Sequence, residues 1–128
     1  MKPIVVVLLL LLGLALGGCT SQPILNIDHQ AVVTSSRAPS MQDVEGAIVR
    51  AGTGLGWVMT PVRPGLVTGR LALRTHVAAV DVAYDTKTFS IQYKDSVNLD
   101  YANGTIHKNY NGWIQNLERE IRANLLRL

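Results

Sequence analysis

The apolar residues between positions 66 and 93 change parity twice along the chain, and this pattern is the strongest constraint on the fold. Side chains alternate between the two faces of a strand, so one unbroken strand over this segment would place its apolar residues on opposite faces. A turn or bulge near Arg74-Thr75-His76 resolves the conflict. The apolar positions are odd in Leu71 and Leu73, even in Val80, Val82 and Tyr84, and odd again in Phe89, Ile91 and Tyr93.

This parity predicts four antiparallel strands in a meander, over 57–62, 66–73, 77–84 and 88–94. Arg63-Pro64-Gly65 has Pro and Gly in the order that a type II turn prefers, and Asp85-Thr86-Lys87 closes the third strand. A three-stranded sheet is the alternative. The outward face of the sheet is expected to be small, polar and flat enough to meet a partner. Its predicted members are Arg70, Ala72, Arg74, Ala79, Asp81, Ser90, Gln92 and Lys94.

Two amphipathic helices flank the predicted strands. Ser40 and Asp43 form a capping box before apolar residues that recur at steps of three and four up to Ala51, and Gly52 is expected to end that helix. A second helix is predicted over 106–125, with Asn103-Gly104-Thr105 as cap and turn residues. A helix on a membrane surface is the alternative, but its polar face would carry more Lys and Arg. The predicted fold is therefore α+β, with helix, meander and C-terminal amphipathic helix, and with both helices on one sheet face.

The N-terminus has the three parts of a secretory signal peptide. A cationic start, Met1-Lys2-Pro3, precedes an apolar run over 4–16, and two small residues then lead to Cys19. The run of about 13 residues is too short to cross a hydrocarbon core of roughly 30 Å, which needs about 20. The alternative is an ordinary signal peptide with an incidental cysteine nearby.

The string Leu16-Gly17-Gly18-Cys19 resembles the lipobox of bacterial lipoproteins. The resemblance implies that the Cys19 thiol receives diacylglycerol, that cleavage precedes Cys19, and that a further fatty acid such as palmitate joins the new amino group. Several acyl chains anchor a protein stably. Thr20, in place of an Asp after the cysteine, implies the outer membrane with the domain facing the periplasm. The expected organisation is a signal peptide over 1–18, a lipidated tether over 19–39 and one domain over 40–128. An edge strand over 24–33 is the alternative to part of the tether.

Composition narrows the function classes. The only cysteine is committed to lipid, so stability must come from a hydrophobic core and no disulfide is expected. Loss of Lys2 with the signal leaves 11 Lys and Arg against 9 Asp and Glu, a formal net charge of +2. These charges are interspersed, whereas a nucleic-acid surface needs a basic stripe with aromatic residues. We therefore expect no nucleic-acid partner.

The C-terminal half, over 57–117, also resembles a group of small uncharacterised bacterial envelope lipoproteins. The resemblance rests on Arg74-Thr75-His76, on Tyr93-Lys94-Asp95-Ser96-Val97-Asn98-Leu99, and on a segment that starts at Ile106-His107-Lys108 and ends at Trp113. It implies no particular activity.

No catalytic residue, metal site or cofactor is predicted. Ser96, Asp100 and His107 supply the residue types of a hydrolytic triad, but no nucleophile elbow surrounds Ser96. The histidines are too scattered for a metal site, and paired carboxylates for glycan cleavage need a cleft that a small domain rarely provides.

A binding site is the stronger hypothesis, because Asn and Asp beside aromatic rings recognise sugars and peptides. The candidate residues are Arg74, His76, Asn98, Tyr101 and His107, and binding requires that they converge on one concave pocket. The competing interpretation is structural, with Asn and Asp closing turns and the rings filling the core. The function expected is a lipid-anchored, non-catalytic interaction or assembly module with an envelope protein partner. A binding domain or enzyme acting on an envelope polymer such as peptidoglycan is the alternative.

Overall fold

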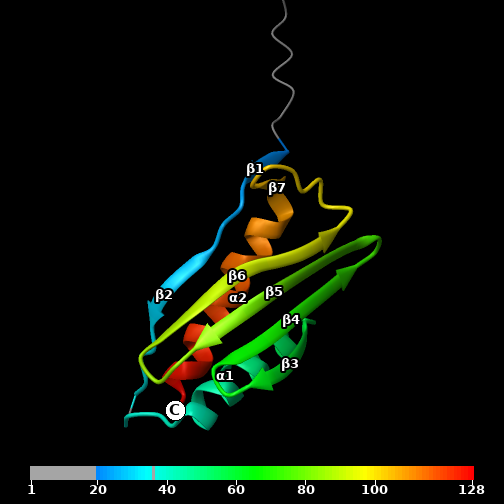
Figure 1. The fold of residues 1–128 in the computed structure, drawn as a ribbon. Coiled ribbons are helices and arrows are strands. Elements are labelled where there is room, and N and C mark those ends of the chain that lie inside the picture. The colour runs from blue at the N-terminus through cyan, green and yellow to red at the C-terminus, as the bar shows by residue number, and fades with distance from the viewer. Residues whose placement is uncertain (1–19, 36) are drawn as a thin grey trace, which may run out of the picture.

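Two helices cover one face of a five-stranded antiparallel sheet in the computed structural model, which describes residues 20–35 and 37–128 (Figure 1). The expected signal peptide and Cys19 lie outside these residues. The elements, in chain order, are β1 (Ser21–Pro23), β2 (Ile27–Ala31), α1 (Met41–Gly54), β3 (Val58–Arg63), β4 (Leu66–Leu73), β5 (His76–Tyr84), β6 (Thr88–Val97), β7 (Thr105–His107) and α2 (Lys108–Leu126). Among the described helices, none is long and apolar enough to cross a membrane.

The four predicted strands correspond to β3, β4, β5 and β6, which are consecutive antiparallel neighbours, but the predicted sheet is incomplete because it has five strands. Leu73 pairs with His76 across a two-residue turn, so the change of parity occurs where the sequence requires it. Gly65 follows Pro64 with a φ of 94°, as a type II turn demands. The three-stranded alternative is wrong.

The sheet has a fifth strand, β2, that the predicted tether did not include. β2 pairs with β6, and Ile27 lies opposite Ile91 in the core with 8% of its surface exposed. β1 pairs with β7 in a separate two-stranded sheet. The prediction of a free tether is therefore wrong for these residues, and the edge-strand alternative is confirmed between Ile27 and Ala31. A bulge at His29, whose φ is 48°, breaks the alternation that would have marked the strand.

Helix α1 begins as predicted but ends later. Both hydrogen bonds of the capping box are present: the Ser40 hydroxyl accepts from the Asp43 N–H, and the Asp43 carboxylate accepts from the Ser40 N–H. The predicted stop at Gly52 is wrong, since the helix continues to Gly54. Gly52 lies buried against β3, where a Cβ atom would overlap the Met59 side chain. Gly52 therefore allows α1 to pack closely against β3.

Helix α2 begins at Lys108, two residues after the predicted start at Ile106. Ile106 lies in β7, and Asn103-Gly104 forms the turn of a short hairpin in which both residues have positive φ. From Lys108 onward the predicted amphipathic pattern is confirmed. The inward face of α2 comprises Tyr110, Ile114, Leu117, Ile121, Asn124 and Leu125.

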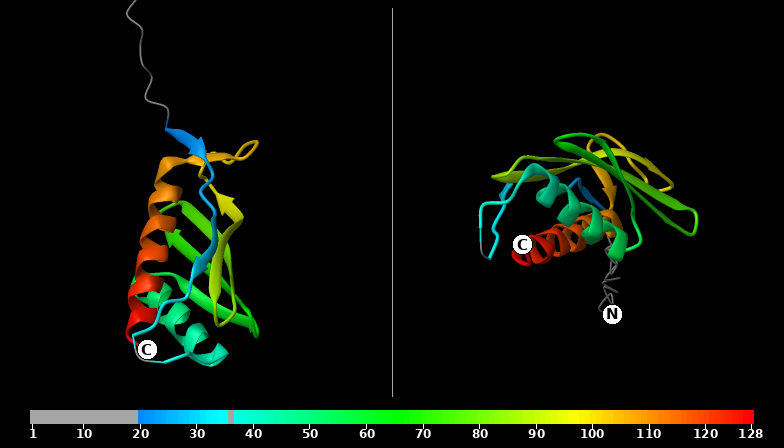
Figure 2. Two further views of the ribbon diagram at one scale, coloured as in Figure 1. Left: turned by 90° about the vertical axis from the view of Figure 1, so that its left-hand side faces the viewer. Right: turned by 90° about the horizontal axis from the view of Figure 1, so that it is seen from below.

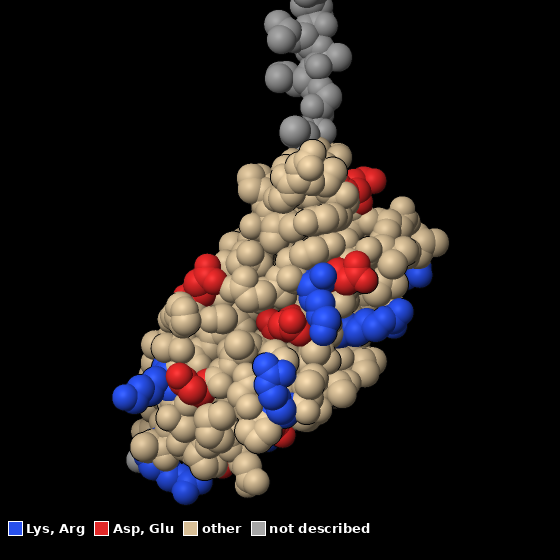
Figure 3. All heavy atoms as spheres, in the orientation of Figure 1, with Lys and Arg blue, Asp and Glu red and all other residues tan. Residues whose placement is uncertain are grey.

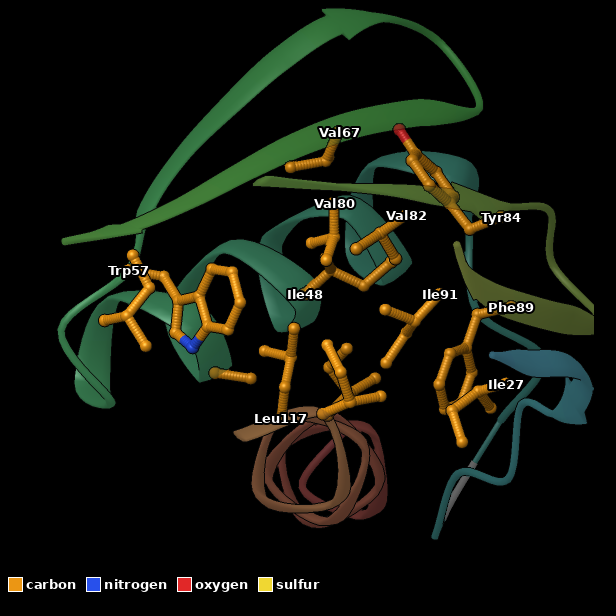
Figure 4. Close-up of a cluster of buried hydrophobic side chains, with 14 of the residues drawn as sticks. Ile27, Ile48, Trp57, Val67, Val80, Val82, Tyr84, Phe89, Ile91 and Leu117 are labelled. Atoms are coloured by element: carbon orange, nitrogen blue, oxygen red, sulfur yellow. The ribbon is translucent and has the colours of Figure 1, made fainter. Parts of the chain in front are cut away.

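The core lies between the sheet and the two helices, which share one sheet face as predicted (Figure 2). Val80, Val82 and Ile91 point from the sheet toward Ile48 of α1 and Leu117 of α2 (Figure 4). All five are fully buried, so each contributes on the order of 1.5–3 kcal/mol of hydrophobic stabilisation. On the opposite face, Arg70, Ala72, Arg74 and Lys94 are exposed, and Ala79, Asp81 and Gln92 are half-buried. Ser90 is buried there, and its hydroxyl accepts the His29 N–H of β2.

Candidate functional site

Three of the five predicted binding residues meet at one end of the sheet. Nδ1 of His76 lies 2.6 Å from the carbonyl oxygen of Asn98, which assigns the proton to Nδ1. The Asn98 amide donates to the Thr75 hydroxyl at 2.7 Å. Arg74 occupies the same turn with a φ of 55°. These contacts fasten the β4–β5 turn to the end of β6, as the structural interpretation expects.

Tyr101 belongs to a cluster of tyrosine rings. It stacks on Tyr93 with ring centroids 4.7 Å apart, and Tyr93 meets the edge of Tyr110 at 5.7 Å. Tyr101 is 51% exposed, whereas Tyr110 is fully buried and its hydroxyl has no hydrogen-bond partner within residues 20–35 and 37–128. Burial raises the pKa of the Tyr110 phenol, and the neighbouring Tyr93 raises it by a smaller amount.

His107 has a structural role at the start of α2. Its backbone N–H donates to the carbonyl oxygen of Leu99 at 2.8 Å, and its Nδ1 accepts from the Asn109 N–H as an N-cap. The five predicted residues therefore divide among a turn contact, an aromatic cluster and a helix cap. None of them lines the hollows described below.

Two members of the candidate hydrolytic triad, Ser96 and His107, are engaged in other contacts. The Ser96 hydroxyl lies 2.8 Å from the Tyr93 hydroxyl, and the Ser96 N–H donates to Asp95. Within the described residues, no group of three or more His, Cys, Asp or Glu side chains is placed to hold a metal ion.

An open groove of about 410 Å³ lies along the first turns of α2. It is lined by Gln22 of β1 and by Lys108, Asn109, Asn111, Gly112, Trp113, Gln115 and Asn116 of α2. We call it the α2 groove. Within the described part of the chain, the side chains of Lys108, Asn109, Trp113 and Gln115 make no hydrogen bond. Their donors and acceptors are therefore available to a ligand. Spacings of three and four place Asn109, Trp113 and Asn116 on one side of the helix.

A smaller apolar hollow adjoins this groove. It has a volume of about 90 Å³ and is lined by Leu55, Trp57, Leu71 and Leu73, together with Trp113 and Asn116, which also line the α2 groove. Leu73 and Leu55 are 45% and 37% exposed. The two hollows together form one amphipathic surface, with amide groups on one side of Trp113 and apolar side chains on the other.

Gly112 lies in the α2 groove next to Trp113, inside the helix. Glycine in a helix interior costs about 1 kcal/mol relative to alanine. A Cβ atom at Gly112 would meet nothing within 4 Å, so packing within the chain does not require a glycine. Because Gly112 has no side chain, it leaves space in the groove beside the indole ring of Trp113.

The sequence did not point to this surface. Trp113 was expected to fill the core, and it does pack partly against it. The apolar hollow needs residues from the segment between α1 and β3, from β4 and from α2, which are far apart in the sequence. The one local signal was the density of Asn, Gln and Gly around Trp113.

Two further hollows are smaller. One, of about 170 Å³, includes His29, Tyr84 and Asp85. There the Asp85 carboxylate accepts the N–H groups of Thr88 and Lys87, which lowers the pKa of Asp85, and the Tyr84 hydroxyl donates to Glu45 at 2.8 Å. The other, of about 160 Å³, includes Val33 and Leu126. In the first hollow, the Asp85 carboxylate and the Tyr84 hydroxyl therefore already have partners, and the second is lined mainly by apolar side chains.

Comparisons of this chain with protein-family models, with curated proteins and with solved structures found no match.

Proposed function

We propose that the protein is a lipid-anchored, non-catalytic interaction module of the bacterial envelope. The observation that carries the binding role is the amphipathic surface formed by the α2 groove and the apolar hollow, because it combines unpaired amide groups with exposed apolar side chains. The anchoring role rests on the lipobox, in which Leu16, Gly17 and Gly18 precede Cys19. Thr20 after the cysteine favours the outer membrane, with the domain facing the periplasm.

The partner that fits this surface best is an extended or helical segment of another envelope protein. A peptide presents backbone amides, which Asn109 and Gln115 can bond, and apolar side chains, which Leu55 and Leu73 can contact. Interface cores are enriched in aromatic residues and depleted in charge. Trp113 at the junction of the two hollows is the residue type that most often dominates binding energy.

Site-specific photo-crosslinking tests this proposal. A photoreactive amino acid at Gln115, in the α2 groove, should give one dominant protein adduct in intact cells. The matched control is the same amino acid at Ala72, which is exposed on the opposite sheet face and should not give that adduct. Adducts only to abundant bulk proteins, or equal adducts from both positions, would contradict the proposal.

A glycan such as peptidoglycan is the second candidate ligand, and the Trp113 ring among amides favours it. Sugars stack on aromatic rings and bond to amides, but they need no apolar hollow beyond the ring. Leu73→Ser therefore separates the two candidates. It should weaken the protein adduct at Gln115 strongly, whereas cosedimentation with purified peptidoglycan should be unaffected if the ligand is a glycan.

A further inference from the structure

We propose that the end of the domain formed by residues 20–26 and the loop 98–104 lies directly against the bilayer headgroups, with Tyr101 in the membrane interface. This inference rests on the proposed lipidation of Cys19. It concerns the end of the domain that adjoins the α2 groove, with which it shares Gln22, and a different partner, which is the lipid headgroup layer itself.

Almost no linker separates Cys19 from the first hydrogen-bonded residues of the domain. The carbonyl oxygen of Thr20 accepts the Lys108 N–H at 2.7 Å, and Ser21 already pairs with His107. Asn111 fastens the same segment further: its amide donates to the carbonyl oxygen of Pro23 at 2.9 Å, and its Oδ1 accepts the Leu25 N–H at 2.9 Å. The domain therefore begins at the first residue after the lipid attachment.

The lengths involved leave no room for a gap. Consecutive Cα atoms are about 3.8 Å apart, and each headgroup layer is roughly 5–8 Å thick, given a core of about 30 Å within a bilayer of about 40–45 Å. A glyceryl group on Cys19 would sit at the inner edge of that layer. Thr20 and its hydrogen-bonded neighbours then fall within the headgroups or at their surface.

The fold determines which other residues share this end. β1, the loop 98–104 and the start of α2 lie together where the chain enters the domain, and the C-terminus lies at the opposite end (Figures 1 and 2). α2 has 19 residues and is about 28 Å long at 1.5 Å per residue. The β5–β6 turn, which contains Lys87, is at the far end from β1 (Figure 1).

The chemistry of this end suits a headgroup layer. Residues 20–26 and 98–108 carry one acidic residue, Asp100, and one basic residue, Lys108. On the face shown in Figure 3, charged side chains gather mainly over the middle and lower parts of the domain. Tyr101 is 51% exposed, and stacking on Tyr93 holds its ring in place. Tyrosine is enriched at membrane interfaces because its ring is apolar and its hydroxyl is polar.

Cysteine labelling tests the inference on the purified, lipidated protein in phosphatidylethanolamine–phosphatidylglycerol vesicles. Lipid blocks the Cys19 thiol, so Tyr101→Cys supplies the single free thiol of the chain. Its reaction with a water-soluble maleimide should be several-fold slower on vesicles than in the non-lipidated Cys19→Ser background. The matched control, Lys87→Cys, should react equally fast in both. Ala102→Cys in the same loop repeats the measurement if Tyr101→Cys does not fold.

A linker variant checks that proximity causes the shielding. About 20 Gly and Ser residues inserted between Cys19 and Thr20 would reach about 25 Å and should restore fast labelling at Tyr101→Cys. Equal shielding at Lys87→Cys, or slow labelling that persists with the linker, would overturn the inference. Failure of the lipidation proposal is distinguishable, because a non-lipidated protein would show a second reactive thiol by mass spectrometry and would not float with the vesicles.

Discussion

Tyr110→Phe should stabilise the protein. The Tyr110 hydroxyl is fully buried and has no hydrogen-bond partner among the described residues. A buried polar group without a partner costs about 1–3 kcal/mol, and phenylalanine keeps the ring and its contact with Tyr93. Taking the low end, we expect the free energy of unfolding to rise by about 1 kcal/mol, which raises Tm by about 4 °C for a domain of this size.

Tyr93→Phe is the matched control for this substitution. It removes the same atom from a neighbouring ring, but the Tyr93 hydroxyl lies 2.8 Å from the Ser96 hydroxyl. The loss of that bond should lower the free energy of unfolding by about 1 kcal/mol. Urea denaturation of both variants, monitored by Trp fluorescence, measures the two changes. A Tyr110→Phe variant that is destabilised as much as Tyr93→Phe would refute the reasoning.

The pH dependence of stability gives a second readout of Tyr110. Burial raises the pKa of its phenol in the folded state, whereas the unfolded chain ionises near the ordinary value of about 10. Above that pH the unfolded state loses a proton that the folded state keeps, so stability falls as pH rises. One such group contributes at most about 1.4 kcal/mol per pH unit. Tyr110→Phe should make the fall in the free energy of unfolding above about pH 10 shallower by a comparable amount. Tyr84, whose pKa is also raised by burial, should account for the fall that remains.

Three further substitutions test other parts of the structure. Gly112→Ala should raise the free energy of unfolding by about 1 kcal/mol and weaken the photo-adduct at Gln115, because its methyl group enters the α2 groove; a stabilised variant with an unchanged adduct would contradict the proposed site. Ser40→Ala should lower the free energy of unfolding by about 1 kcal/mol through loss of the N-cap. In the unsubstituted protein, the Ser40 N–H lowers the pKa of Asp43, so the stabilisation from that carboxylate should be lost as pH falls below 3.8. Asn111→Ala should cost about 2 kcal/mol and speed amide exchange over residues 20–26, with residues 77–84 as the internal reference.

The sequence predicted the elements whose apolar pattern is regular and local. The parity of Leu73, Val80 and Phe89 located the meander, and the Ser40–Asp43 pair located the start of α1. β2 was predicted only as the alternative to a tether, because a bulge at His29 interrupts its alternation and only Ile27 is buried within it. Its place in the sheet depends on pairing with β6, which lies about 60 residues away.

The candidate site was harder to predict because polar residues serve turns and ligands alike. Asn98 and His107 have the residue types of a binding site, but their hydrogen bonds close a turn and cap a helix. The α2 groove instead contains four side chains that make no hydrogen bond among the described residues, namely those of Lys108, Asn109, Trp113 and Gln115, and that property depends on the fold. Within the Asn-, Gln- and Gly-rich stretch around Trp113, Gly112 is informative because a glycine inside an amphipathic helix has a cost that something must offset.

The proposed location of the domain and its proposed orientation both depend on lipidation of Cys19. Cells expressing the full chain should be grown with a labelled fatty acid, and the mature protein should be recovered from membranes. We predict that the label is incorporated, that the N-terminal peptide begins at Cys19 and carries the mass of its acyl chains, and that Cys19→Ser takes up no label. Equal label in wild type and Cys19→Ser, or a mature protein that still begins at Met1, would contradict the account.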